Sequence, residues 1–180
     1  GEYNEEVLAY NAKFEEIHKN ADEATLKEMG ESIYLVQCAQ CHGTTGDGLS
    51  GKAQDFSARM TKAQVLDVIN NGQNQLGYPM GAMPAGMAQG EQAEEIAAYV
   101  ASGMRGPQPA SFAACSSCHG VDGQGNNGMS PNLVSYDAAL MSHTLQNGKK
   151  GMIGKMPSFK TLITPVQEKA LTVYIQSLSN

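Results

Sequence analysis

The pattern Cys-x-x-Cys-His occurs twice in this chain, at residues 38–42 and 115–119, and it constrains the fold more than any other feature. Each copy is followed by Gly and by a loop with several further glycines. Downstream of each copy come a Met-Pro pair, which begins at Met83 or Met156, and then an apolar segment that contains a Tyr. Because these features recur in the same order at nearly the same spacing, they indicate an internal duplication.

The chemistry of this pattern is specific, since Cys-x-x-Cys-His is the attachment signature of c-type haem. The two thiols add to the two haem vinyl groups and form thioethers, and the adjacent His supplies an imidazole ligand to the iron. The sequence therefore predicts two covalently attached haem c groups. The residues expected to hold them are Cys38, Cys41 and His42 for the first haem, and Cys115, Cys118 and His119 for the second.

The second axial ligand is predicted to be a methionine in each half. His/Met ligation is usual in cytochromes that carry electrons, and it raises the reduction potential. We assign Met83 to the haem of His42 and Met156 to the haem of His119, because each precedes Pro at a matching place in the repeat. Full coordination of both irons favours an electron carrier over an enzyme that binds peroxide.

Other residues compete for this axial position. Met80 and Met87 share a loop with Met83, and Met152 shares one with Met156. Methionines more often fill gaps in a core. His143 could also replace Met156 as a ligand, although a satisfied core or surface role is the more common one for such a histidine.

Other uses of the four cysteines fit the sequence less well. A tetrahedral zinc site made by all four would leave both adjacent histidines and both Met-Pro pairs without a role. A dithiol redox centre would require a βαβ setting, which the sequence lacks. Two disulfides between neighbouring cysteines are less favoured still.

In many cytochromes c, a proline in the loop after the motif orients the ligand histidine through its carbonyl oxygen, and we expect this for His119. Pro131 lies in the loop after the second motif, where its carbonyl can accept the N–H of the His119 ring. The first half has no Pro at the comparable place, around residues 53–56, and the sequence identifies no partner for His42 there. The two haems are therefore expected to differ in potential.

Apolar residues recur at helical spacing along most of the chain, which predicts an all-α fold. We expect helices over residues 4–20, 24–40, 62–71, 92–101, 136–146 and 165–178, with a short helix before the second motif. A stretch rich in Gly and Pro at residues 102–109 separates the repeats. The predicted organisation is an N-terminal amphipathic helix or spacer over 1–23, a first domain over 24–102, a linker over 103–110 and a second domain over 111–180.

The net charge of −6 disfavours nucleic acid as a partner, because phosphate binding requires clustered Lys and Arg. It suits a basic partner protein, through electrostatic steering. No apolar run approaches the length of roughly 18–20 residues that is needed to span a bilayer. The chain begins at Gly1 without an initiator Met, and we expect a processed or trimmed product.

Each half resembles a class I cytochrome c domain, a small helical bundle around one haem. In that family the helix before the motif carries Gly and, four residues on, an aromatic residue, as Gly30 and Tyr34 do here. The last helix carries an aromatic residue that packs against this pair. Tyr99 and Tyr174 match that position in the first and second half, respectively.

The whole chain resembles the diheme P subunit of cbb3-type cytochrome c oxidases, through its segment 3–14 followed by two haem motifs. The pairs Asn71-Gly72 and Asn147-Gly148, which precede the Met-Pro loops, also fit this family. The chain departs from it in two ways: Gln73 and Lys149 replace an Arg that often follows Asn-Gly, and neither Met-Pro pair is followed by Trp. The resemblance implies a bacterial subunit on the periplasmic side of the inner membrane, anchored by a segment outside this chain. It also implies that a soluble donor cytochrome reduces this subunit, which passes electrons to the catalytic subunits.

Two alternatives remain open from the sequence. A free diheme shuttle, resembling cytochrome c4, would carry the same two motifs without a membrane anchor. A diheme peroxidase would need one haem with an open coordination position, which the two Met-Pro pairs argue against.

Overall fold

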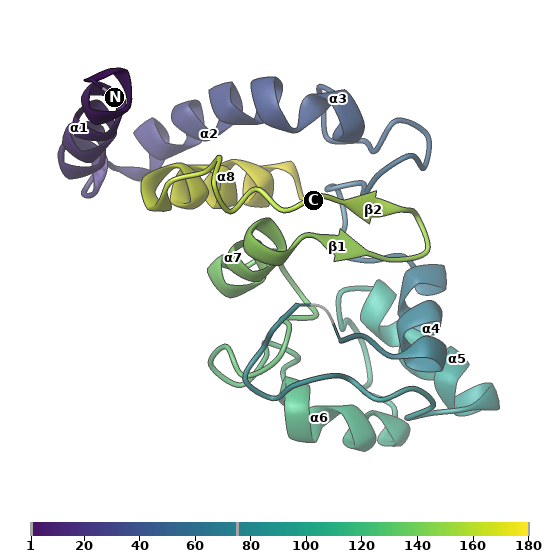
Figure 1. Cartoon of the computed structure of the whole chain (residues 1–180). Coiled ribbons are helices and arrows are strands. Elements are labelled where there is room, and N and C mark those ends of the chain that lie inside the picture. Colours follow the sequence, from purple (N-terminus) through teal and green to yellow (C-terminus); the bar gives the residue numbers. More distant parts are fainter. Residues whose placement is uncertain (1, 75, 180) are drawn as a thin grey trace.

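A computed structural model describes residues 2–74 and 76–179, with side chains from residue 5 onward, and its regular secondary structure is almost entirely helical (Figure 1). The elements are α1 (Glu2–His18), α2 (Glu23–Gln37), α3 (Ala39–His42), α4 (Lys62–Asn71), α5 (Gly90–Ala101), the 3₁₀ turn η1 (Ala110–Phe112), α6 (Ala113–His119), α7 (Ala138–Asn147), β1 (Lys149–Lys150), β2 (Lys155–Met156) and α8 (Pro165–Leu178). The prediction of an all-α fold is confirmed. The short antiparallel hairpin β1–β2 was not predicted.

Local sequence explains where the main helices begin. Thr61 and Thr164 each cap a helix, since the Thr side-chain oxygen accepts the N–H of Gln64 or Gln167, and the Thr backbone N–H donates in return to the side-chain oxygen of that Gln. This capping box satisfies N–H groups that the first helical turn leaves unpaired. The predicted ranges for α4 and α8 agree with the structure to the residue.

One group of elements surrounds the first motif. Helix α2 packs along α8, and this is the most extensive contact between helices in the described part of the chain. Tyr34 and Tyr174 meet there with ring centroids 5.2 Å apart. Helix α7 packs on α8 as well, and Figure 1 shows α8 lying between α2 and α7. We call residues 23–59 and 136–178 the first unit.

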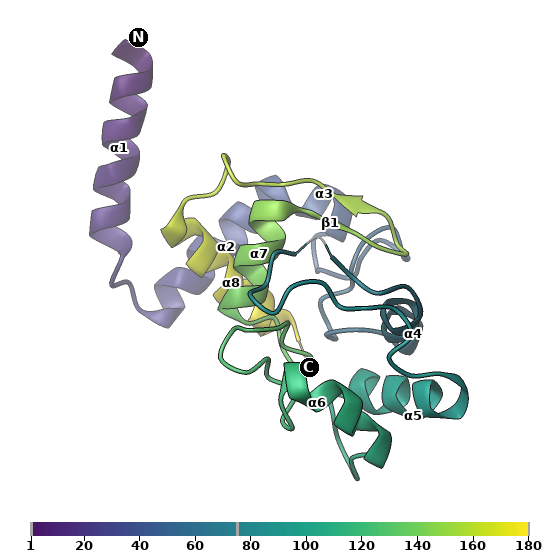
Figure 2. The ribbon, with the colours of Figure 1, turned by 60° about the horizontal axis from the view of Figure 1, so that its bottom comes forward.

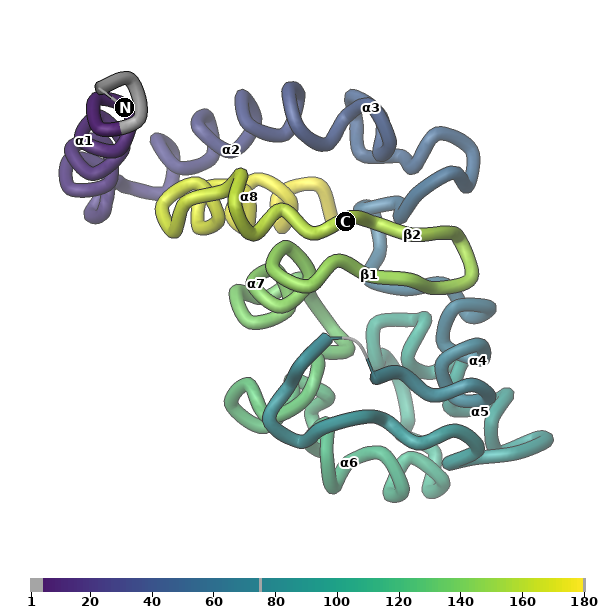
Figure 3. Tube along the Cα trace, in the orientation of Figure 1, coloured from purple at the N-terminus to yellow at the C-terminus, as the bar shows by residue number. Residues whose placement is uncertain are grey.

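A second group surrounds the second motif. Helices α4 and α5 pack together, and η1 contacts both α5 and α6. Phe112 is fully buried in a cluster with Ile69, Ala97 and Val100, and Cys115 packs at its border. We call residues 60–135 the second unit, which occupies the lower part of the molecule in Figure 3.

These packed units differ from the two ranges that the repeat predicts. The expected contact of Tyr99 with the helix before the first motif is absent from the described structure, since Tyr99 instead packs on Phe112 with ring centroids 5.7 Å apart. The reason is that α5 and α8 present an aromatic residue at equivalent positions. Either can therefore satisfy α2, and the sequence does not distinguish them.

Helix α1 stands apart from the two units, and Figure 2 shows it projecting away from them. Its carboxylate Glu15 accepts a hydrogen bond from the backbone N–H of Val166 at 2.9 Å, which ties it to the start of α8. None of the helices in residues 2–74 and 76–179 is both long and apolar enough to cross a bilayer.

Candidate functional site

The two ligand histidines end short helices and are oriented in the same way. Both are 8% exposed. The Nδ1 atom of His119 donates to the carbonyl of Pro131 at 2.9 Å, which confirms the prediction for the second half. The Nδ1 atom of His42 donates to the carbonyl of Gln54 at 3.1 Å. Since a carbonyl can only accept, Nδ1 carries the proton and Nε2 keeps its lone pair for a metal.

Sequence reasoning missed Gln54, although a signal was present. Each accepting carbonyl lies 12 residues after its histidine. The loops between are built alike, because Gly48 donates its N–H to the His42 carbonyl and Gly125 donates to the His119 carbonyl. Counting 12 residues from His42 would have identified the partner without a proline.

Burial shifts the pKa of both histidines in the same direction. It lowers the pKa of His42, and the hydrogen bond to Gln54 partly opposes this. It also lowers the pKa of His119, where the Pro131 bond opposes the shift and the positive charge of Arg59 adds to it. A neutral imidazole is the form that coordinates iron.

No disulfide joins any two of the four cysteines. Cys38 is buried, and burial, with the neighbouring Cys41, raises its pKa to about 11. The cysteines belong to separate units, and among the residues that the structure describes no three His, Cys, Asp or Glu side chains gather around a common metal position.

The methionine loops separate the candidates for the axial position. Met83 and Met156 are half-buried, whereas Met80, Met87 and Met152 are 48%, 40% and 55% exposed. Both preferred methionines sit in hairpins that begin at an Asn-Gly helix end. Met83 pairs with Gln73, and Met156 pairs with Lys149.

Glycine is required at the start of each hairpin. A Cβ on Gly72 would lie 2.5 Å from the Met83 carbonyl oxygen, and one on Gly148 would lie 2.5 Å from the Met156 carbonyl oxygen. Such approaches are too close for any side chain. The Asn-Gly pair therefore fixes the backbone of the methionine against the end of the preceding helix in both halves.

The two preferred methionines lie in loops that are anchored on different parts of the structure. Met156 packs at the border of the cluster that contains Cys38, in the first unit. The Met83 loop is anchored on α4, where Gly86 donates its N–H to the Ile69 carbonyl at 2.7 Å.

His143 stacks on Tyr78 with ring centroids 4.0 Å apart. It is half-buried in α7 and takes part in the packing between the Met83 loop and the first unit. This contact gives the histidine a structural role, so nothing in the geometry favours it over Met156 as a ligand.

Two cationic side chains and a buried hydroxyl lie near one another and suit the carboxylates of a haem. Arg59 donates its Nε–H to the Asn132 carbonyl at 3.0 Å and lies over the Tyr136 ring. Burial and the charge of Arg59 lower the pKa of Lys149 to about 8. The Tyr78 hydroxyl is buried nearby, and no hydrogen-bond partner for it exists among the described residues. Anionic propionates would satisfy all three groups.

Comparison with known proteins agrees with this geometry. Residues 25–100 and 107–175 each match the family described as cytochrome c oxidase, cbb3-type, subunit III. The chain belongs to this family. It accordingly binds two haem c groups covalently, one at each Cys-x-x-Cys-His motif.

Several relatives match nearly the whole chain. The cbb3-type cytochrome c oxidase subunit CcoP of Helicobacter pylori is 38% identical over 99% of this chain and 67% of its own length. The corresponding protein of strain ATCC 700392 / 26695 is 36% identical over 95% of this chain and 66% of its own length. The cbb3-type cytochrome c oxidase subunit FixP of Azorhizobium caulinodans is 30% identical over 93% of this chain and 65% of its own length. The chain thus spans about two thirds of these relatives.

Proposed function

We propose that this chain is the electron-entry part of a cbb3-type terminal oxidase. It accepts single electrons from a soluble donor cytochrome and passes them to the catalytic subunits, without an oxygen chemistry of its own. The observation that supports this most directly is the pair of motifs, each with a His held by a carbonyl and a half-buried Met within the same fold. Relatives along nearly the whole chain carry the name of such a subunit.

The proposed haem-binding residues are Cys38, Cys41, His42, Met83, Cys115, Cys118, His119 and Met156. The iron of each haem supplies one-electron chemistry by alternating between ferric and ferrous states. The imidazoles are fixed in the tautomer that presents Nε2, and the thioether sulfurs of the two methionines would favour the ferrous state. With both axial positions filled, no place is left for oxygen or peroxide, which argues for a carrier.

The proposed location is the periplasmic side of the bacterial inner membrane, with the membrane contact made by a segment outside these 180 residues. The greater length of the relatives is consistent with such a segment. The net charge of −6 suits a basic donor cytochrome, and docking would then weaken as ionic strength rises.

The deciding experiment is to extract the native full-length protein from cells and identify what accompanies it. Copurification from membranes with haem b subunits that reduce oxygen is the expected result. Recovery of the protein alone in the periplasmic fraction would replace the proposal with a free diheme shuttle.

A second measurement tests the carrier role in the purified protein. Neither haem should bind carbon monoxide when reduced or cyanide when oxidised, because no axial position is open. The matched variants Met83→Ala and Met156→Ala should each open one haem to carbon monoxide. Binding by the unmodified protein would instead favour a peroxidase.

A further inference from the structure

The hairpin β1–β2 ends in an exposed apolar turn. Gly151 donates its N–H to the Gly154 carbonyl at 2.9 Å, and Gly154 donates in return to the Gly151 carbonyl at 3.2 Å. Met152 and Ile153 are therefore the two residues at the tip, where they are 55% and 37% exposed. Tight turns usually contain Gly, Asn or Asp, which adopt the backbone that such a turn requires. An exposed Met-Ile pair adds little to folding at this place, which indicates contact with another molecule.

The segment that contains this turn is cationic, although the protein is acidic. Residues 138–167 include Lys149, Lys150, Lys155 and Lys160 but no Asp or Glu. Since the net charge of the whole chain is −6, the residues outside this segment carry a net charge of −10. The two signs of charge are therefore separated along the chain, and the hairpin carries the positive one.

Two of these lysines flank the turn in an arrangement that folding alone does not favour. Lys150 and Lys155 lie directly opposite each other across the hairpin, and both are exposed. Like charges at opposed positions of an antiparallel pair are destabilising. Lys155 forms no ion pair with any residue in the described part of the chain. Lys149, in contrast, is half-buried within reach of the Arg59 charge, so it belongs to the groups that suit haem carboxylates.

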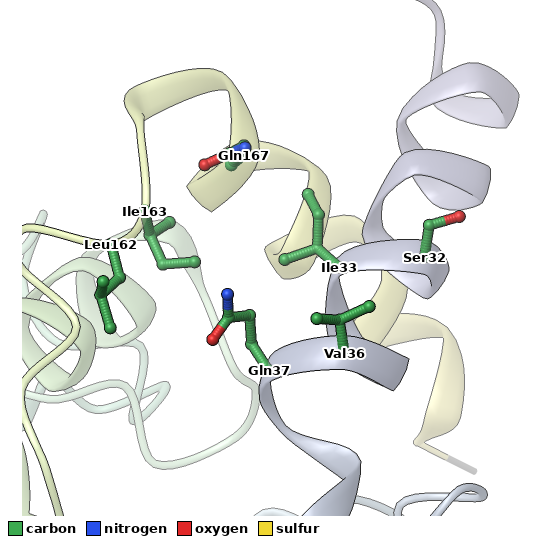
Figure 4. Close-up of a pocket in the computed structure, with 7 residues that line it drawn as sticks. All are labelled: Ser32, Ile33, Val36, Gln37, Leu162, Ile163 and Gln167. Carbon is green, nitrogen blue, oxygen red and sulfur yellow. The ribbon is translucent and has the colours of Figure 1, made fainter. Parts of the chain in front are cut away.

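Another exposed apolar surface lies farther along the chain. Leu162 and Val36, which are 57% and 78% exposed, line a shallow groove between residues 162–167 and α2 (Figure 4). None of the described side chains that line it is charged. The groove therefore does not indicate the chemistry of an occupant, whereas the hairpin combines an apolar tip with charges of one sign.

We propose that the tip of the hairpin β1–β2 is a docking surface for an acidic redox protein. Met152 and Ile153 form the apolar centre of the contact, and Lys150 and Lys155 form its cationic rim. The partner accordingly presents a small apolar area bordered by carboxylates. An anionic bilayer suits this surface less well, because the charge of −10 on the other residues would be repelled from it. Those other residues remain suited to the basic donor of the proposed function.

The redox role of this surface rests on the proposed function, because Met156 is a haem ligand only there. Lys155 and Met156 are the two residues of β2, so the docking surface borders a proposed axial ligand. Lys155 is exposed, whereas Met156 is half-buried and packs at the border of the core of the first unit. A protein docked on the turn is thus placed close to one haem, with only the hairpin between them.

Titration calorimetry tests docking by itself. The probe is an acidic blue-copper protein, and both proteins are fully oxidised, so that no electron can pass between them. Lys150→Glu with Lys155→Glu should weaken binding about tenfold at low ionic strength. The matched control is Lys27→Glu with Lys169→Glu, which changes the net charge equally at exposed lysines of α2 and α8. The control should weaken binding less than about twofold, because screening limits the reach of distant charges. Equal weakening by both pairs would show that only net charge matters, and it would overturn the proposal.

The apolar tip is tested at high ionic strength, where the lysines are screened. Met152→Ser with Ile153→Ser should weaken binding of the same probe about fivefold, through the lost apolar contact. Val36→Ser with Leu162→Ser alters the groove of Figure 4 instead and should leave binding unchanged. Weakening by the groove variant alone would place the contact in the groove and overturn the proposal. Sedimentation with phosphatidylserine vesicles tests the membrane alternative, and it should not depend on Lys150 and Lys155.

Stopped-flow mixing of the reduced diheme protein with the oxidised probe measures electron transfer across this surface. Each electron that passes oxidises one ferrous haem iron and reduces one copper(II) to copper(I). Lys150→Glu with Lys155→Glu should slow this reaction about tenfold at low ionic strength. The reaction with a basic single-haem cytochrome, by contrast, should not be slowed.

The two probes together distinguish failure of the docking surface from failure of the proposed function. Exchange with the basic cytochrome alone would overturn the docking surface and leave the electron-entry role standing. If neither probe exchanged electrons with the diheme protein, the proposed function would fail as well. Vesicle binding that depends on the two lysines, without binding of the acidic probe, would assign the hairpin to the membrane and overturn the proposal.

Discussion

The two haem-binding units carry the same motif, but the helix that precedes the motif is much longer in the first unit than in the second. In the first unit α2 supplies 15 residues before the motif, and Tyr34 packs on the Tyr174 ring. In the second unit a 3-residue turn and its single buried aromatic, Phe112, take the place of that helix. The His-to-carbonyl geometry is nevertheless the same in both. One buried aromatic residue against the last helix is therefore the minimum that the motif needs on this side.

The largest effect is expected at Phe112, because it is the fully buried side chain of the short turn. Phe112→Ala should lower the free energy of unfolding by about 4 kcal/mol, through lost burial and the cavity left behind. Denaturant unfolding followed by circular dichroism measures it. Val121→Ala, at a residue that is 71% exposed, is the control and should change stability little. A loss under about 1 kcal/mol would show that the second unit has further anchors.

The next largest effect is expected where α2 touches α8. Gly30→Ala places a methyl group against the Ala170 carbonyl and should cost about 2 kcal/mol of stability, despite the better helix propensity of Ala. Gly151→Ala is the matched control, since its Cβ would meet nothing within 4 Å. A neutral Gly30→Ala would indicate that α2 and α8 are farther apart in solution.

A smaller effect should distinguish the haem at His42 from the haem at His119. The Gln54 side chain anchors its own loop, accepting from Gln64 at 2.7 Å and donating to the Tyr136 hydroxyl at 3.2 Å. Gln54→Ala should cost about 1 kcal/mol of stability and loosen the hydrogen bond from His42 Nδ1–H to the carbonyl of residue 54. The imidazole then donates less electron density to the iron. The potential of the haem at His42 should then rise while the other stays constant. Spectroelectrochemical titration tests this, and equal shifts in both haems would contradict it.

The smallest effect concerns pH. Burial raises the pKa of Glu168, and this outweighs the lowering caused by Ser142. Around this group the folded protein therefore binds more protons than the unfolded chain. The stability that Glu168 contributes is complete below pH 4.5, the ordinary pKa of a glutamate, and it is lost as the pH rises through the pKa of the folded state. Glu168→Gln should remove this slope and stabilise the protein at pH 7 by a few tenths of a kcal/mol, roughly. Its equivalent in the second unit is the buried Ala93, where no such slope can arise. Unfolding curves from pH 4 to 7 measure the difference.

The sequence predicted most of the local structure and the chemistry. Helices α4 and α8, the two motifs and the Pro131 carbonyl follow from caps, periodicity and spacing, which act over a few residues. It could not predict which last helix closes which motif, because a duplication supplies two similar partners and the choice depends on linker path and packing. The assignment of Met83 to the haem of His42 and of Met156 to the haem of His119 stays a prediction.

The packing of α2 on α8 has a consequence for how the protein is made. Synthesis proceeds from the N-terminus, so Cys38 and Cys41 emerge on the order of a hundred residues before the helix that covers them. During that interval the first motif stays open, and its thiols are exposed to the haem and to the enzymes that attach it. The second motif has its α4 and α5 partners ready when it emerges. The duplication thus sets an order of completion, in which the site that begins first is the last to close.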